Sequence, residues 1–172
     1  SLLDRRQVVA LEADDGGEVA APRMEHECRT GQNRVGDASE PVDSQFGGLV
    51  APRGSGEHVL CVDDDPAMAL MVDGLLRRSG YRVTAYEDPA AALARVKADP
   101  GAFDLLVTDY NMPEMNGMEL ATEVGRAAPG LPVIITSGFI SDEMRQRASD
   151  LAVGALLQKE YTLERLPGLV HA

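Results

Sequence analysis

Charged residues directly follow apolar runs at three places in the chain, and together they could handle a metal ion and a phosphoryl group. Asp109 follows the run 103–108, the acids at 63–65 follow the run 58–62, and Lys159 follows the run 154–158. Short apolar runs of this kind are typical of buried strands in a parallel sheet. The carboxyl ends of such strands form the edge where open α/β sheets bind ligands. We therefore expect the acids and the lysine to converge at one sheet edge.

Phosphoryl transfer to a carboxylate would explain this combination. A carboxylate is a modest nucleophile and a phosphoryl donor is anionic, so a cation and fixed donors must absorb charge. Mg²⁺ prefers near-octahedral oxygen ligands. Asp64 and Asp109 could each supply one carboxylate oxygen. Asp63 could hold a metal-bound water, and the backbone carbonyl of Asn111 could supply a further oxygen.

The elements that must position these residues alternate regularly from His58 onward. Strands are expected at 58–62, 81–85, 103–108, 131–136 and 154–158, and helices at 66–79, 89–98, 117–127, 142–150 and 162–170. Apolar strands separated by helical periodicity indicate βαβ units, which form a parallel sheet covered on both faces. The sequence therefore predicts an α/β domain.

Helix signals agree with this division. Asp65 and Asp88 each precede a proline, so both are interpreted as N-caps with proline at the first helical position. Ser141 and Thr162 are plausible N-caps, and Gly80 can close the first helix. The face of the first helix that packs on the sheet is expected to carry Leu70, Met71, Leu75 and Leu76.

The chain divides near residue 56. Residues 1–56 carry recurrent Gly, Pro, Asp, Glu and Ser, and are predicted to form a poorly structured N-terminal extension. Only the stretch from Leu2 to Leu11 could make a short helix. Residues 51–56 are interpreted as a flexible linker, and residues 57–172 as the folded domain.

Composition excludes several classes of protein. The 172 residues carry a formal net charge of −12, with 6 basic against 10 acidic residues up to position 56 and 10 against 18 beyond it. Both parts are acidic, so a nucleic-acid-binding surface is not expected. Two cysteines far apart make neither a disulfide framework nor a zinc site. No apolar stretch reaches the length of a membrane span, and a reducing cytoplasm is the expected location.

From Val59 to about Leu166 the chain resembles the response-regulator receiver domains of two-component signalling. The resemblance rests on the order and spacing of four segments: Val62-Asp-Asp-Asp-Pro66, Asp109-x-x-Met-Pro-x-Met-x-Gly117, Leu131-Pro-Val-Ile-Ile-Thr-Ser-Gly138 and Lys159. It implies a flavodoxin-like, doubly wound (βα)5 fold with a five-stranded parallel sheet in the order 2-1-3-4-5.

The resemblance also implies roles for single residues. Asp109 is expected to become the aspartyl phosphate, with Mg²⁺ held by Asp63, Asp64, Asp109 and the carbonyl of Asn111. Ser137 matches the hydroxyl that hydrogen-bonds the phosphoryl group, and Lys159 matches the lysine that pairs with it. The expected partner is a histidine kinase or phosphotransfer protein, and no separate organic cofactor is expected. The oligomeric state is left open.

Three positions depart from the family pattern. The family usually has proline after the lysine, often with a cis peptide, whereas Glu160 follows Lys159 here. Leu156 stands where the family often has an aromatic switch residue, so aromatic rotamer switching is not expected. Pro167 and Gly168 are expected to cut the last helix short.

Two alternative functions remain. One is a degenerate receiver that binds a partner without phosphorylation. The other is an aspartate-nucleophile phosphohydrolase, but such an enzyme needs an acid two residues after its nucleophile, where this chain has Asn111. The favoured interpretation is a phosphoacceptor switch rather than an enzyme, with at most self-phosphorylation from small donors and self-dephosphorylation. We expect either a single-domain regulator or the C-terminal receiver of a hybrid histidine kinase.

Overall fold

The computed structural model describes residues 9–11, 54–151 and 153–171. The strands are β1 (Val9–Leu11), β2 (His58–Val62), β3 (Arg82–Tyr86), β4 (Leu105–Asp109), β5 (Val133–Ser137) and β6 (Ala155–Gln158). The helices are α1 (Pro66–Arg78), α2 (Pro89–Ala98), α3 (Gly117–Ala127), α4 (Asp142–Asp150) and α5 (Thr162–His171), with a 3-10 turn at Lys159–Tyr161. Most of the N-terminal extension predicted over residues 1–56 lies outside the described residues.

The strands form one parallel sheet in the order β1-β6-β5-β4-β2-β3. The five strands from β2 to β6 follow the doubly wound order 2-1-3-4-5, so the predicted flavodoxin-like fold is confirmed. In this order the connection from β3 to β4 passes back across β2, and the carboxyl ends of β2 and β4 therefore lie side by side. That junction is the switch point where such sheets bind ligands.

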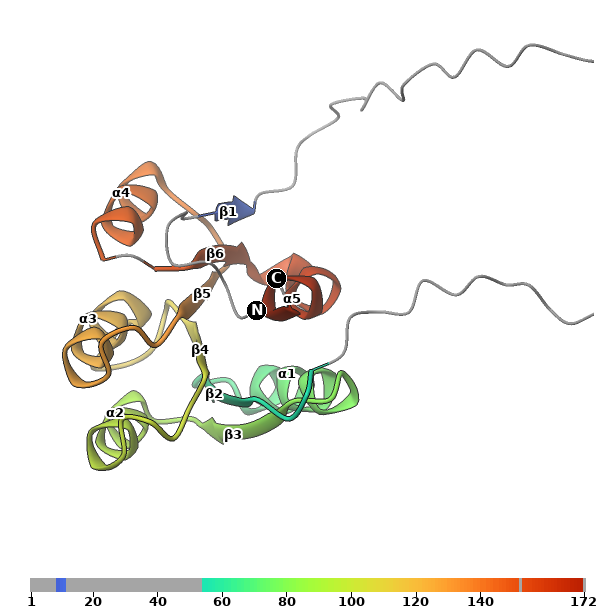
Figure 1. Ribbon diagram of the computed structural model, residues 1–172. Coiled ribbons are helices and arrows are strands. Elements are labelled where there is room, and N and C mark those ends of the chain that lie inside the picture. The colour runs from blue at the N-terminus through green and yellow to red at the C-terminus, as the bar shows by residue number, and fades with distance from the viewer. Residues whose placement is uncertain (1–8, 12–53, 152, 172) are drawn as a thin grey trace, which may run out of the picture. The chain divides into compact units, whose positions relative to one another are not determined.

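Helices cover both faces of the sheet. Figure 1 shows α1 and α5 on one face and α2, α3 and α4 on the other. The buried apolar side chains form two clusters that match these layers, one containing Leu76 and Leu166 and the other Val96, Leu120 and Ala148. All five residues of β4 and all five of β5 are buried. The central strands are therefore held rigidly where they deliver side chains to the carboxyl edge.

Several predicted strands begin one or two residues later than expected. The strand expected at 131–136 begins at Val133, because Pro132 has no N–H to contribute to the ladder. The carbonyl of Pro132 still accepts a hydrogen bond from the Leu106 N–H at 3.0 Å. β4 ends on Asp109 itself, so this carboxylate belongs to the last residue of a fully buried strand.

The inward face of α1 differs from the expected one. The residues buried against the sheet are Ala69, Val72 and Leu76, whereas Leu70 is 72% exposed and Met71 is 45% exposed. The spacing of the buried residues still gives a single helical stripe, but one that is rotated because the small Ala69 packs inward. Leu70 consequently faces away from the core.

The last helix is not cut short. α5 continues through Pro167 to His171, although proline removes one helical hydrogen bond. Leu166 and Val170, one turn apart, are 0% and 1% exposed. Burial of this apolar face outweighs the lost bond, since tertiary packing supplies most of the stability of a helix in a protein.

Two stretches of the predicted extension adopt structure. Val9–Leu11, at the end of the stretch expected to form a short helix, is a strand that pairs with β6. In the predicted flexible linker, the Gly54 N–H donates to the Ser79 carbonyl at 2.7 Å, and the Gly56 N–H donates to the Gly80 carbonyl at 3.1 Å. The linker is therefore fixed from Gly54 onward.

No helix within the described part of the chain is both long enough and apolar enough to cross a membrane.

Candidate phosphoacceptor site

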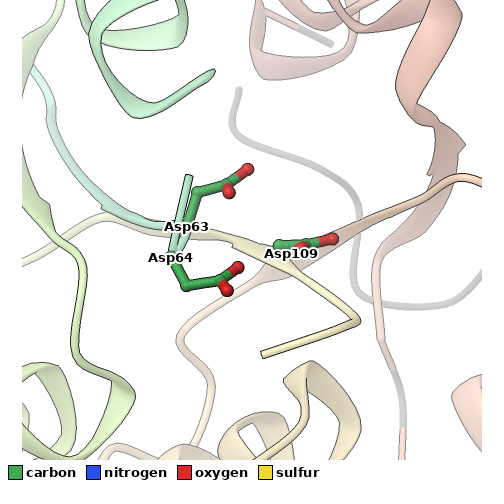
Figure 2. Close-up of side chains that lie close together, drawn as sticks. All are labelled: Asp63, Asp64 and Asp109. Atoms are coloured by element: carbon green, nitrogen blue, oxygen red, sulfur yellow. The ribbon is translucent and has the colours of Figure 1, made fainter. Parts of the chain in front are cut away.

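The charged residues singled out from the sequence lie together at the carboxyl edge of the sheet. Asp63 and Asp64 follow β2, Asp109 ends β4, Ser137 ends β5, and Lys159 follows β6. Figure 2 shows the carboxylates of Asp63, Asp64 and Asp109 grouped beside the ends of their strands. Because β4 lies between β2 and β5, Asp109 is at the centre of the site.

The carboxylate of Asp109 has one occupied and one free oxygen. The residue is 2% exposed, and its Oδ2 lies 2.9 Å from the Nζ of Lys159. Its Oδ1 is buried without a hydrogen-bond partner. A buried carboxylate oxygen without a partner is costly, because it has lost its hydration. The free oxygen therefore indicates a site that is completed by a ligand.

Asp63, directly after β2, contacts the same lysine as Asp109. Its Oδ1 accepts a hydrogen bond from the Asp65 N–H at 2.9 Å, and its Oδ2 lies 3.5 Å from the Nζ of Lys159. Burial raises the pKa of Asp63 above its ordinary value, and the nearby Asp109 raises it further. The Asp65 N–H and Lys159 lower the pKa without cancelling the effect of burial. The site thus holds a carboxylate whose charge is stabilised only in part.

Lys159 is held between the two buried acids. Burial alone would lower the pKa of its ammonium group, but the hydrogen bond that it donates to Asp109 and the charge of Asp63 outweigh burial and raise the pKa. The lysine is therefore charged at neutral pH. A fixed ammonium group in this position can pair with an anion that approaches Asp109.

The three carboxylates fit a divalent cation. One oxygen from each of Asp63, Asp64 and Asp109 can be chosen so that all three lie within 4.8 Å of one another. Hard oxygen donors of this kind suit Mg²⁺, and the free Oδ1 of Asp109 is available as a donor. Asn111, expected to contribute its backbone carbonyl, lies two residues beyond Asp109 in the loop that leads to α3.

Gly117 allows the loop between β4 and α3 to pack closely on the site. The Gly117 N–H donates to the Tyr110 carbonyl at 2.9 Å. A Cβ at Gly117 would lie 2.2 Å from the backbone oxygen of Asp109, so no larger residue fits without a shift of backbone. Glu114, within the same loop, has a φ of 65°. The loop therefore packs directly on the backbone of Asp109 and limits the movement of that residue.

The Ser137 hydroxyl is occupied within its own loop. It donates to the Phe139 carbonyl at 2.7 Å and accepts from the Phe139 N–H at 3.3 Å. Ser137 is 2% exposed at the end of β5, whereas the Phe139 side chain is 74% exposed. The hydroxyl lies at the expected edge, and it must exchange these bonds to reach a group on Asp109.

Asp65 has the structural role predicted for it. Its side chain accepts a hydrogen bond from the Ala67 N–H at 2.9 Å and caps α1. The cap positions the start of α1 directly after the acid pair. The sequence interpretation missed the exposure of Leu70, one turn into the same helix, although the alternative stripe Ala69, Val72, Leu76 could have revealed it.

Comparison with known proteins identifies the class of this domain. The family model for the response regulator receiver domain matches residues 59–171. The chain therefore belongs to the response regulator receiver family, as the sequence resemblance predicted. Receiver domains act in two-component systems, generally as signalling phosphoacceptors rather than enzymes.

Individual relatives agree. The chain is 31% identical over 110 residues to the response regulator receiver protein CpdR of Brucella abortus, covering 64% of this chain and 90% of that protein. It is 37% identical over 99 residues to the putative two-component response regulator ARR21 of Arabidopsis thaliana, covering 58% of this chain but only 16% of that protein. Much of the latter relative thus lies outside the matched region.

Solved structures show the same fold. The chemotaxis protein CheY4 of Vibrio cholerae matches with a TM-score of 0.59 and 29% identity, over 64% of this chain and 92% of that one. The receiver domain of the histidine kinase CKI1 from Arabidopsis thaliana, complexed with Mg²⁺, matches with a TM-score of 0.61 and 25% identity. That match covers 70% of this chain and 92% of the other.

Proposed function

We propose that this domain is a phosphoacceptor switch in which Asp109 takes a phosphoryl group from a phosphohistidine. The histidine belongs to a histidine kinase or a phosphotransfer protein. The observation that carries the proposal is the state of the Asp109 carboxylate: one oxygen is paired with Lys159, and the other is buried, unpartnered and beside two further acids. Such an oxygen is poised to accept a cation or a new covalent bond.

The residues of the site divide the work of transfer. An oxygen of Asp109 attacks the phosphorus, the P–N bond to the imidazole breaks, and the electron pair remains on the departing nitrogen. Asp63, Asp64, Asp109 and the carbonyl of Asn111 would hold Mg²⁺, which supplies positive charge for the phosphoryl oxygens when bound. Lys159 and the Ser137 hydroxyl would bind the remaining oxygens of the transferred group.

Exposed apolar side chains near the site suggest where the donor protein docks. Leu70, one turn into α1, is 72% exposed, and Phe139, two residues beyond Ser137, is 74% exposed. Both follow strands that end at the phosphoacceptor site. We assign these two side chains to the contact with the phosphohistidine-bearing partner, because large exposed apolar residues near a functional site often serve binding.

The alternatives have less support. A degenerate receiver would not need the complete set of Asp63, Asp64, Asp109, Ser137 and Lys159. A phosphohydrolase would need a general acid two residues beyond the nucleophile, and Asn111 has no carboxyl group. The phosphoacceptor reading uses every charged group of the site.

Incubation with acetyl phosphate distinguishes the three hypotheses of a phosphoacceptor, a degenerate receiver and a phosphohydrolase. With Mg²⁺, the phosphoacceptor reading predicts at most one phosphoryl group per chain, measured by intact mass, and little labelling in EDTA. Asp65→Asn is the matched control for Asp109→Asn, since asparagine caps a helix as well as aspartate does. A folded protein that takes no label would favour the degenerate receiver. Repeated turnover of p-nitrophenyl phosphate would favour the phosphohydrolase.

A further inference from the structure

The outer edge of β6 is covered by a strand from the N-terminal region. Val9, Ala10 and Leu11 pair in parallel with Ala155, Leu156 and Leu157. Figure 1 shows β1 alongside β6, at the end of the sheet opposite β3. Without β1, the backbone groups on this side of β6 would form an open sheet edge. β1 therefore pairs with the otherwise open backbone of β6, the strand that leads to the phosphoacceptor site.

β6 connects this added strand to two groups of the site. The strand ends at Gln158, and Lys159 follows directly. On its other side β6 pairs with β5, where Gln158 is opposite Ser137. The last β1 pair, Leu11 with Leu157, lies only two residues before Lys159. Any displacement of β6 would therefore be transmitted to the Nζ that lies 2.9 Å from Asp109.

The residue after Lys159 offers little constraint of its own. Glu160 is exposed and is the middle residue of the 3-10 turn Lys159–Tyr161, which leads directly into α5. The peptide bonds of the described residues are all trans. Proline would have fixed the backbone at this point, whereas glutamate leaves φ free. The position of Lys159 therefore depends more heavily on how firmly β6 is held in the sheet.

We propose that β1 is a positioning strand for Lys159, which docks on the outer edge of β6 and holds the lysine in register with Asp109. The occupant of this edge is residues 9–11 of the same chain. A three-residue strand makes few hydrogen bonds, so it can detach while the five-stranded sheet stays folded. Detachment loosens β6 and slows phosphorylation. The part concerning rate rests on the proposed function of Asp109.

The test uses the full chain with two substitutions at one position. Ala10→Pro removes an N–H and fixes φ at about −65°, away from the value of a parallel strand, so it disfavours pairing. Ala10→Val keeps the strand, since β-branched residues favour it. Successive N–H groups of a strand point to opposite sides, so half of the β6 amides face β1 and half face β5. In Ala10→Pro, hydrogen exchange should accelerate most at the amides that face β1, and less at those that face β5. Exchange equal to that of Ala10→Val would overturn the docking.

Two further readouts address Lys159 itself. The chain has one other lysine, Lys97 on α2, so after reductive methylation the ¹³C signals of the two lysines can be compared. Ala10→Pro should shift the Lys159 signal and leave that of Lys97 unchanged. Phosphorylation by acetyl phosphate should slow by about threefold to tenfold, less than the roughly 100-fold that a misplacement of about 1 Å can cost. An unchanged lysine signal would overturn the positioning role.

A double-mutant cycle distinguishes positioning from general loosening. If β1 acts through Lys159, Ala10→Pro should cause no further slowing in a Lys159→Ala background. A full additional slowing there would overturn the proposal. Protection of β6 that depends on protein concentration would also overturn it, because the strand would then come from a second copy. If the parent itself takes no phosphoryl group, the proposed function fails, while hydrogen exchange and the lysine signal still decide whether β1 positions Lys159.

Discussion

The two edges of the sheet are built in opposite ways. The carboxyl edge brings together Asp63, Asp64 and Asp109, and it leaves one buried carboxylate oxygen without a partner. At the amino edge, backbone groups of residues 54–57 pair with residues 79–82. There, the Tyr81 ring is 5% exposed and packs so closely on Gly54 that an added Cβ would lie 2.6 Å away.

The difference shows that the carboxyl edge lowers the stability of the folded state and that the amino edge raises it. Like charges and an unpaired oxygen make the carboxyl edge costly until a ligand binds. The amino edge has satisfied backbone groups and close packing, both of which stabilise the folded state without a ligand. Substitutions at the carboxyl edge should therefore affect phosphorylation, whereas substitutions at the amino edge should affect stability alone.

Removal of the Lys159 ammonium group should have the largest effect. Lys159→Ala leaves Asp109 and Asp63 buried without their common partner, so phosphorylation should slow by about tenfold or more. Unfolding free energy without metal should fall by about 1–3 kcal/mol, as expected for unpaired buried charge. Acetyl phosphate labelling and urea unfolding measure the two quantities. Lys97→Ala, at an exposed position on α2, is the control; equal losses in both variants would contradict the comparison.

A substitution at the amino edge should lower stability without affecting phosphorylation. Gly80 has a φ of 91°, and a Cβ there would lie 2.6 Å from the Gly54 oxygen. Gly80→Ala should cost about 1–3 kcal/mol of unfolding free energy, the range for a strained backbone position. Labelling of the folded protein should be unchanged. Gly74→Ala, within α1 where a Cβ meets no atoms, should instead stabilise by about 0.5–1 kcal/mol.

Metal binding at the carboxyl edge should raise the unfolding free energy of the domain. Mg²⁺ at ten times its dissociation constant should raise the unfolding free energy by about 1.4 kcal/mol through mass action. Asp64→Asn should remove most of this gain and slightly stabilise the metal-free protein, because one of three repelling carboxylates is gone. Asp65→Asn should keep both the helix cap and the gain. Thermal unfolding with and without Mg²⁺ tests this, and equal loss in both variants would show that Asp64 is not a ligand.

The smallest effect should appear in the pH dependence of stability without metal. The pKa of Asp63 is raised above its ordinary value of 3.8, chiefly by burial. Its folded state thus binds a proton more tightly than the unfolded state, and stability falls as pH rises from about 4 through the folded pKa. Relative to Asp63→Asn, the parent should lose stability as the pH rises above about 4 in EDTA. An opposite slope would contradict the assigned cause.

The comparison of edges also explains what the sequence could and could not predict. The acids and Lys159 could be predicted because each follows a strand whose apolar run is continuous, and parallel topology then places all strand ends together. Ser137 was assigned only through the resemblance to receiver domains. The pairing of Lys159 with both Asp63 and Asp109 required atomic positions. The expectation at α1 was wrong for Leu70 because two apolar stripes fit the same helix, and packing of Ala69 selects between them.

Structure upstream of β2 could not be predicted for a different reason. Gly54 and Gly56 suggest a flexible linker by composition, but their contacts come from Ser79 and Gly80, which are distant in sequence. Likewise, Val9–Leu11 is too short to show a period, and the edge of β6 determines its structure. Propensity is a weak guide where tertiary contacts decide. Limited proteolysis should therefore leave a fragment that still contains Gly54, rather than one cut between Gly54 and Gly56.

Asp109 is the residue that we propose carries the phosphoryl group. The most direct measurement is peptide mapping by mass spectrometry after phosphorylation with acetyl phosphate and Mg²⁺, with Asp109→Asn treated in parallel. We expect a single modified residue, Asp109, and no label on the folded Asp109→Asn variant. A phosphoryl group mapped to Asp63, Asp64 or any other residue of the parent, or full labelling of Asp109→Asn, would contradict it.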